Sequence, residues 1–105
     1  MSGEVYRARF DGRGHEQRGV RYAVVLQTDR LPWLSTWVVA PTTGSDGPAP
    51  AVFRPDLVID GETGRVLVEQ LRAFDPQRLG DYVRNLTWEE RQDVDRALRY
   101  VFDLD

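Results

Sequence analysis

Apolar and polar residues alternate in the first ten positions of the chain. Between Val5 and Phe10 the apolar side chains face one way and two arginines face the other, which is typical of a half-buried strand. Apolar runs at Tyr22–Leu26 and Thr36–Ala40 predict two further strands, and Pro41 is expected to end the second of them. Other apolar runs predict three more β segments, at Val52–Phe53, Leu57–Ile59 and Arg65–Phe74.

Polar segments rich in glycine and proline separate these strands. Asp11–Gly19 contains three glycines and no apolar residue, so it is expected to be a loop. Gln27–Ser35, Thr42–Pro50 and residues 60–64 are expected to be loops or turns for the same reason. The pair Asp75-Pro76 is expected to end the last strand, because the residue before a proline is restricted in conformation.

The C-terminal segment changes to a helical period. Thr87, followed three residues later by Glu90, fits a capping box. Behind it, apolar residues recur at helical spacing with charged residues between them, at Val94, Ala97, Leu98 and Val101. One amphipathic helix of about fourteen residues is therefore expected. Strands followed by a single helix predict a mainly β (α+β) fold, in which a small antiparallel sheet forms a partly open barrel closed by the helix, with residues 1–105 as a single domain.

Composition narrows the chemistry that the chain can perform. The 105 residues include no cysteine and one histidine, His15, which excludes a disulfide scaffold, a cysteine nucleophile and a multi-histidine zinc site. No run approaches the roughly 20 apolar residues that cross a bilayer, and the N-terminus lacks the order of a signal peptide. We therefore expect a cytoplasmic protein that needs no membrane, metal ion or other cofactor.

The charge distribution favours an anion site near the N-terminus. The net charge is −3, all fourteen basic residues are arginines, and residues 1–30 hold six arginines against four acidic residues. Guanidinium groups grip phosphate oxygens in pairs, so an arginine-rich surface suits a phosphate ligand. A GC-rich coding sequence would produce the same arginine bias without any functional cause.

Polar groups suited to chemistry gather in the loop and strand at 15–21 and at the end of the third strand, 42–45. Antiparallel pairing of these strands would bring the two places together. An arginine, a hydroxyl, a histidine and a carboxylate in one pocket suit phosphate chemistry without a metal ion. RNA is the natural substrate, because its 2′-hydroxyl supplies the nucleophile. Sequence motifs of serine hydrolases, P-loop enzymes and zinc proteases do not occur.

Five segments in order resemble the MazF/PemK (Kid) toxin family. They are GEVY (3–6), RGHEQRGVR (13–21), VVAPTTGS (38–45), VEQLRAFDPQRLG (68–80) and LTWEERQDVDRALRYVFDL (86–104), and the likeness fades across 46–64. The resemblance implies a MazF/CcdB-like toxin fold. It implies a sequence-specific, metal-independent endoribonuclease that cleaves single-stranded RNA to a 2′,3′-cyclic phosphate and a 5′-hydroxyl. It also implies a homodimer that is neutralised by a cognate MazE-like antitoxin.

The resemblance assigns roles position by position. Arg21 matches the family's catalytic arginine and Thr43 its catalytic hydroxyl residue. Candidates for proton transfer or support are His15, Glu16 and Glu69, although Glu16 would alternatively brace Arg21 and Glu69 would alternatively pair with Arg72. Candidates for RNA binding are His15, Gln17, Arg18, Ser45, Gln70 and Arg72. No residue is assigned to a metal ion.

Three positions depart from the family pattern and keep alternatives open. Tyr22 follows Arg21 where the family has proline, Glu69 replaces an aspartate, and Leu67 stands where one branch has an arginine. One alternative is a gyrase poison on the same fold, although related poisons end in Trp-Gly-Ile and this chain ends in FDLD. The other alternative is a degenerate RNA-binding module that no longer cleaves.

Overall fold

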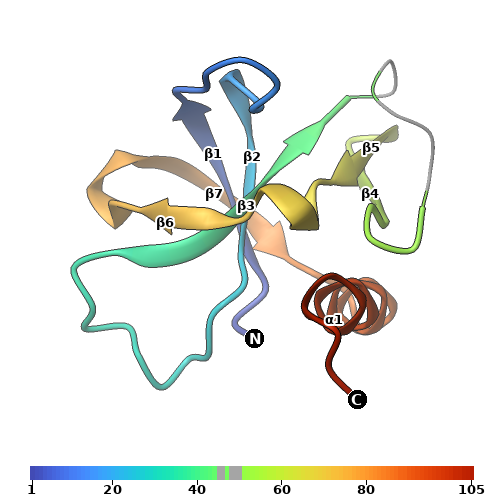
Figure 1. Cartoon of the computed structure of the whole chain (residues 1–105). Helices are drawn as coiled ribbons and strands as arrows, with labels where there is room; N and C mark the ends of the chain where they lie inside the picture. Colours follow the sequence, from blue (N-terminus) through green and yellow to red (C-terminus); the bar gives the residue numbers. More distant parts are fainter. Residues whose placement is uncertain (45–46, 48–50) are drawn as a thin grey trace.

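Seven strands form one antiparallel sheet, with a single long helix packed against it (Figure 1). The computed structural model describes residues 1–44, 47 and 51–105. The strands are β1 (Glu4–Phe10), β2 (Gly19–Val25), β3 (Trp37–Thr43), β4 (Asp56–Ile59), β5 (Glu62–Val66), β6 (Arg72–Phe74) and β7 (Leu79–Asn85). Two short 3-10 turns, η1 (Val68–Gln70) and η2 (Pro76–Arg78), flank β6, and the helix α1 spans Trp88–Phe102.

Strand β3 is the centre of the sheet and has three partners. It pairs with β2 along one edge, and along the other edge with β6 through Trp37–Val39 and with β5 through Thr42–Thr43. The strand order in the sheet is β4-β5-β3-β2-β1-β7, and β6 pairs with β3 outside this path. The turn η2 connects β6 directly to β7, so the sheet curls and these two strands lie at the ends of the curl. This arrangement confirms the predicted mainly β fold with a partly open barrel and a C-terminal helix.

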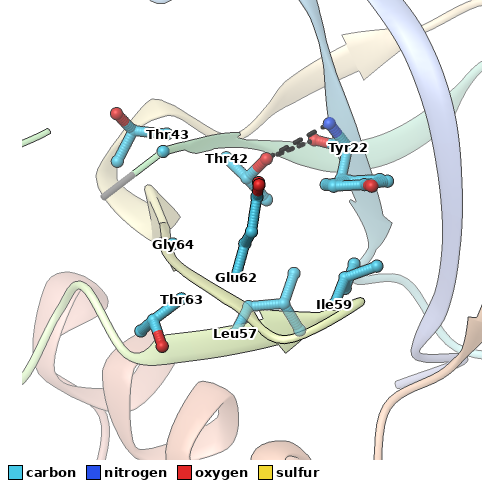
Figure 2. A pocket seen from close by; sticks show the side chains of 9 residues that line it. Tyr22, Thr42, Thr43, Leu57, Ile59, Glu62, Thr63 and Gly64 are labelled. Atoms are coloured by element: carbon cyan, nitrogen blue, oxygen red, sulfur yellow. Dashed lines mark hydrogen bonds between the residues drawn. The ribbon is translucent and has the colours of Figure 1, made fainter. Parts of the chain in front are cut away.

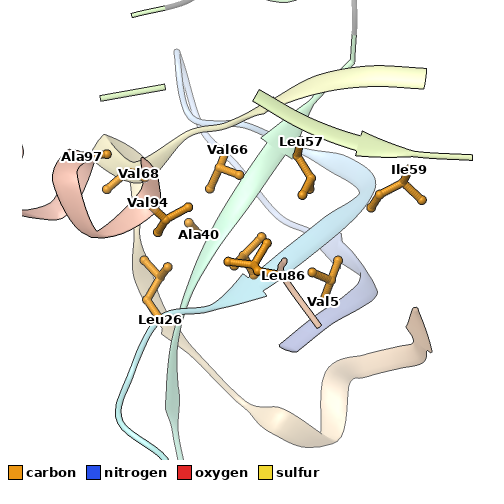
Figure 3. Close-up of a cluster of buried hydrophobic side chains, with 11 residues drawn as sticks. Val5, Leu26, Ala40, Leu57, Ile59, Val66, Val68, Leu86, Val94 and Ala97 are labelled. Atoms are coloured by element: carbon orange, nitrogen blue, oxygen red, sulfur yellow. The ribbon is translucent and has the colours of Figure 1, made fainter. Parts of the chain in front are cut away.

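The sheet buries an apolar cluster on each face. Inside the curl lie Ala8, Phe10, Ala23, Val25, Val39 and Phe74, with the rings of Phe10 and Phe74 5.1 Å apart. The other face packs against β4, β5 and α1 through a second cluster that includes Val24, Ala40, Val66 and Val94 (Figure 3). Burial of each valine side chain contributes about 1.5–3 kcal/mol to stability, so these two clusters hold β2 and β3 in place.

The helix begins and ends at specific local signals. Its first turn has the predicted capping box, in which the Glu90 amide donates to Thr87 Oγ1 over 3.2 Å and the Thr87 amide donates to Glu90 Oε1 over 2.8 Å. Val94 and Ala97 are buried against the sheet. At the C-terminal end Asp103 takes a left-handed conformation with φ of 56°, and this stops the helix.

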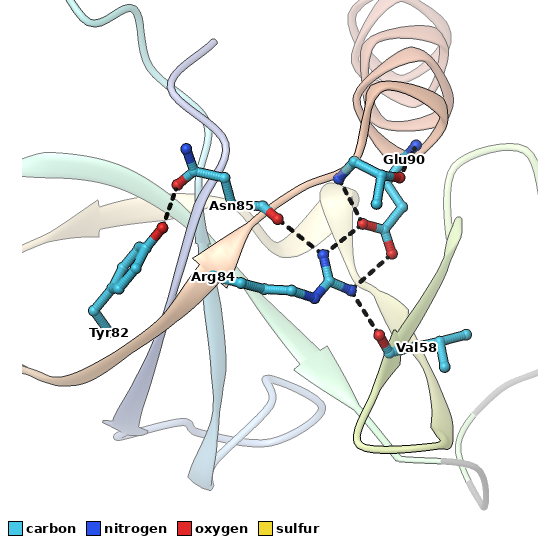
Figure 4. Close-up of polar contacts among 6 residues, drawn as sticks. Val58, Tyr82, Arg84, Asn85 and Glu90 are labelled. Carbon is cyan, nitrogen blue, oxygen red and sulfur yellow. Dashed lines mark hydrogen bonds and ion pairs between the residues drawn. The ribbon is translucent and has the colours of Figure 1, made fainter.

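An ion pair joins the helix to the sheet. The Arg84 guanidinium donates to both carboxylate oxygens of Glu90, over 2.7 and 3.0 Å, and also to the carbonyls of Val58 and Asn85 (Figure 4). Burial alone raises the pKa of Glu90, but the hydrogen bonds from Arg84 and Thr87 outweigh it and leave that pKa below its ordinary value. The contact fixes β7, β4 and α1 relative to one another.

The predicted long strand Arg65–Phe74 is wrong. The segment forms β5, the turn η1 and β6 instead, because it passes from one part of β3 to another. Val66, Leu67 and Val68 are all buried, and a half-buried strand can bury only alternate residues. The break between β5 and η1 lets all three side chains be buried.

Three other expectations fail. The turn expected at residues 60–64 is confined to residues 60 and 61, because β5 already begins at Glu62. Pro41 does not end the strand, which continues to Thr43. The Pro41 carbonyl accepts a hydrogen bond from the Leu67 amide, which lies between β5 and β6 in the chain. Pro41 therefore lies where β3 changes from one partner strand to the other, and its missing N–H removes no hydrogen bond between strands. The expected β segment Val52–Phe53 is a turn bracketed by a single bridge between Ala51 and Arg54.

Strand β7 is absent from the sequence prediction. Its sequence, LGDYVRN, contains glycine, aspartate and asparagine and shows little apolar alternation. Pairing with β1 creates it, through a register that shifts between Val5 and Tyr6 and between Tyr6 and Ala8. Within the described residues no helix has the length and apolar character needed to span a bilayer.

Candidate active site

The two predicted catalytic residues lie at one end of the curl. The β2–β3 ladder ends at the pair Ala23–Pro41, and Arg21 and Thr43 each lie two residues beyond that pair, where Thr43 pairs with Arg65 of β5. Since side chains alternate along a strand, both project on the face that carries Ala23. Between these positions, the Thr42 hydroxyl joins β3 to β2: it accepts a hydrogen bond from the Tyr22 amide over 3.2 Å and donates one to the Tyr22 carbonyl over 3.1 Å.

Arg21 is half-buried and held by its own loop. Its Nε donates to the Arg18 carbonyl over 3.1 Å, and its terminal guanidinium nitrogens make no hydrogen bond to any residue that the structure describes. The expected brace from Glu16 does not form. Glu16 Oε1 instead accepts from the Arg13 amide over 3.1 Å, within the turn of the loop. Glu16 therefore shapes the loop and leaves Arg21 unbraced.

Thr43 is half-buried and sits between two close backbone approaches. A Cβ placed on Gly64 would lie 2.2 Å from the Thr43 carbonyl oxygen, and one placed on Gly47 would lie 2.2 Å from Thr43 Oγ1. Figure 2 shows the Thr43 hydroxyl turned away from the side chains of Thr42 and Tyr22. Gly64 on β5 and Gly47, four residues after Thr43, thus allow the backbone to approach this threonine closely.

The loop between β1 and β2 is pinned over the end of the curl. Gln17 makes two hydrogen bonds that hold the loop. Its backbone amide donates to Gln70 Oε1 over 2.6 Å, and its side-chain Nε2 donates to the Thr42 carbonyl over 2.8 Å. Between the loop and η1 lies an open groove of about 260 Å³, lined among others by Glu16, Pro41 and Glu69. Gln17 and Gln70, both predicted to bind RNA, lie at this joint between the loop and the sheet.

A second joint fixes the start of the same loop. Arg72 Nη1 donates to the Asp11 carbonyl over 3.0 Å, and the Arg78 guanidinium forms an ion pair of 2.9 Å with the Asp11 carboxylate. Arg72 lies 5.8 Å from the ring centroid of Phe10 and Arg78 lies 4.7 Å from that of Phe74. Sequence reasoning overlooked Arg78, whose only local signal was its place after the Asp75-Pro76 pair.

Glu69 has a different partner from the one expected. Its Oε1 accepts from Arg54 Nε over 2.8 Å, so it does not pair with Arg72. Its second oxygen, Oε2, is buried and has no hydrogen-bond partner among the described residues. Glu69 lines the groove beside Gln70, which places a carboxylate on the groove wall.

Two of the remaining predicted residues lie at the surface. His15 and Arg18 are exposed in the loop between β1 and β2. Ser45 falls outside the described residues. Within the ranges that the structure covers, no cluster of three histidine or acidic side chains is arranged to hold a metal ion.

Comparison with known proteins identifies the family. Residues 1–102 match the family model of the PemK-like, MazF-like toxin of type II toxin–antitoxin systems. A Mycobacterium tuberculosis (strain ATCC 25618 / H37Rv) protein named "Putative toxin Rv3098A/RVBD_3098A" is 42% identical over 105 residues, which cover 96% of each chain.

Solved structures share the fold at lower sequence identity. Mycobacterium tuberculosis toxin MazF-mt6 superposes with a TM-score of 0.79 at 18% identity, over 97% of this chain and 98% of that one. MazF from Deinococcus radiodurans gives a TM-score of 0.81 at 22% identity, over 98% and 96%. A mycobacterial endoribonuclease in complex with its cognate antitoxin gives 0.80 at 19%, over 100% and 96%. The chain therefore belongs to the PemK/MazF-like toxin family of type II toxin–antitoxin systems.

Proposed function

We propose that this toxin is a sequence-specific endoribonuclease that cleaves single-stranded RNA without a metal ion. The observation that carries the proposal is that Arg21 and Thr43 lie on the same face of the adjacent strands β2 and β3, just beyond the last pair of their ladder and beside a loop pinned by Gln17. A guanidinium and a hydroxyl on neighbouring strands suit the two non-bridging oxygens of one phosphate. The family membership supports the same reaction class.

The reaction balances with RNA as its own nucleophile. The 2′-hydroxyl loses its proton and its oxygen bonds to phosphorus, while the bond from phosphorus to the 5′-oxygen breaks and that oxygen takes up a proton. The products are a 2′,3′-cyclic phosphate and a 5′-hydroxyl. Arg21 stabilises the doubly charged phosphorane, and Thr43 donates a hydrogen bond to a phosphate oxygen. Arg21 itself hardly deprotonates, so the proton transfers fall to other groups.

The geometry ranks the candidates for these proton transfers. His15 and Glu16 are exposed on the loop beside the site, where they are accessible to a bound RNA. Glu69 is already paired with Arg54, so it supports the groove wall in our proposal. We assign proton transfer to His15 or Glu16, and RNA contacts to Gln17, Arg18, Ser45, Gln70 and Arg72.

The test is cleavage of a long RNA of known sequence in the presence of a chelator, with the cut ends mapped and their chemistry identified. The wild-type protein should cut at a defined word and leave cyclic phosphate ends. Arg21→Ala should reduce kcat by at least about 100-fold, as the loss of one charge-stabilising donor does elsewhere. Arg96→Ala is the matched control, since Arg96 is an exposed arginine paired only with Asp93 on α1. An equal rate for Arg21→Ala and Arg96→Ala would refute the site.

Two partners complete the proposal. The toxin forms a homodimer and is held inactive by a cognate MazE-like antitoxin, whose acidic and apolar tail lies across the arginine-bearing loop and folds there. Binding of antitoxin and RNA should be mutually exclusive in a calorimetric titration. Simultaneous binding would contradict this arrangement, and sedimentation of the free toxin tests the dimer.

A further inference from the structure

A small pocket lies on the opposite face of β2 and β3 from Arg21. It has a volume of about 70 Å³ and opens between these strands and the β4–β5 hairpin (Figure 2). Its apolar floor is formed by Leu57 and Ile59, which are 3% and 6% exposed, and Tyr22 forms a wall. The Arg7 guanidinium lies 5.2 Å from the centroid of the Tyr22 ring and packs against it. The pocket therefore has an ordered, mainly apolar interior.

The carboxylate that lines this pocket is available to a ligand. Thr42 is 4% exposed, and its hydroxyl already bonds twice to the Tyr22 backbone. Glu62 extends from β5 toward β3 among the lining side chains, and its carboxylate makes no hydrogen bond or ion pair with any residue that the structure describes (Figure 2). A ligand in the pocket thus meets an aromatic wall and an unengaged carboxylate.

The pocket adjoins the proposed cleavage site through the backbone. Thr43 contributes to both, and Tyr22 directly follows Arg21 along β2. Because neighbouring side chains of a strand point to opposite faces, the end of the sheet where β2 begins and β3 ends separates the phosphate site from the pocket. A nucleotide strand that passes around this end would place a phosphate on one face and the adjacent base on the other.

We propose that the pocket receives the amino-bearing edge of the base next to the cleaved phosphodiester, and that Glu62 reads it. This inference rests on the proposed ribonuclease function. A carboxylate accepts a hydrogen bond from the N4 amino group of cytosine, whereas uracil presents the O4 acceptor at the same place and is repelled. The volume admits the edge of one ring, and the Tyr22 ring supplies an apolar and aromatic contact for it.

The test uses short RNAs that contain the mapped cleavage word and differ only by cytosine or uracil at the nucleotide on either side of the cut. At one of the two positions the wild type should prefer cytosine about tenfold in kcat/KM, the discrimination expected from one hydrogen bond to a charged group. Glu62→Gln should bring this ratio close to one, because an amide both donates and accepts. Glu89→Gln removes the same charge from an exposed position on α1 and should keep the ratio.

The outcomes separate the pocket from the ribonuclease itself. If the wild type cuts RNA but the cytosine-to-uracil ratio is the same in Glu62→Gln, the pocket assignment is wrong and the ribonuclease proposal stands. If Glu89→Gln abolishes the ratio as well, a general charge effect explains the preference and the assignment is also wrong. If the wild type cuts no RNA under any condition, both proposals fall. Melting curves of the variants exclude unfolding as the cause.

Discussion

The junction between Arg84 and Glu90 allows a quantitative test of how the helix is held on the sheet. Glu90→Gln keeps the size of the side chain and removes its charge. Glu90 accepts three hydrogen bonds, two from Arg84 and one from the Thr87 amide, and its side chain is 15% exposed. The variant therefore weakens a bidentate ion pair and one side of the capping box together.

The expected loss follows from these contacts. Hydrogen bonds to a charged group contribute about 1.5–3 kcal/mol each, but the Arg84 side chain is 31% exposed and solvent screens part of the attraction. We therefore expect Glu90→Gln to lower the free energy of unfolding by about 2 kcal/mol. In a protein of this size that corresponds to a fall in Tm of about 10 °C. Glu89→Gln, at an exposed neighbouring position, should change it by less than about 0.5 kcal/mol.

The loss should also depend on pH. The pKa of Glu90 is lowered in the folded protein, so its contribution is fully present above the pKa of the unfolded chain and is lost as the pH falls through the folded value. The difference in unfolding free energy between wild type and Glu90→Gln should thus be constant above about pH 5 and shrink toward pH 3. Urea unfolding at several pH values measures it.

A double-mutant cycle supplies the decisive comparison. Arg84→Met and Glu90→Gln should together cost less than the sum of the single variants, by about 1 kcal/mol or more, because each single variant already breaks the pair. Additive effects, or equal stability of Glu90→Gln and Glu89→Gln, would show that this ion pair does not hold α1 on the sheet.

Two further predictions concern the site itself. Gly64→Ala should destabilise the protein by about 1–3 kcal/mol and reduce RNA cleavage, because the new Cβ would lie 2.2 Å from the Thr43 carbonyl oxygen. In the control Gly44→Ala the new Cβ enters open space and should be tolerated, so equal thermal unfolding of the two variants would contradict this prediction. Gln70→Ala should speed amide hydrogen exchange at Gln17 and slow cleavage by about fivefold, with less than about 1 kcal/mol of lost stability, because it removes the 2.6 Å anchor of the loop; unchanged exchange would refute the role of that anchor.

Local patterns were sufficient to predict several elements of the fold. The helix α1 was predicted because the capping box at Thr87 and the spacing of its apolar residues are signals contained within one segment. Strands β1 and β2 were predicted for the same reason, since alternation and short apolar runs need no distant partner to be recognised. The order of motifs along the chain also sufficed to recognise the toxin family, which the family match then confirmed.

Elements that depend on a distant partner were decided only by the tertiary structure. Strand β7 forms from a polar sequence because β1 offers it a free edge, and the segment 65–74 is broken because β3 binds its two ends at different places. No local propensity encodes either event, because the stabilising hydrogen bonds come from residues far away in the sequence.

The same distinction applies to the candidate site. The match between the sequence and the family motifs was sufficient to bring Arg21 and Thr43 forward as candidates. The contacts around these residues depend on the folded chain. Gln17 anchors the loop on Gln70, and Arg54 forms an ion pair with Glu69. The side chains of Arg21 and Tyr22 point to opposite faces of β2. The physical reason is that a side chain's partners depend on strand register and sheet curl, which arise from the packing of the whole chain.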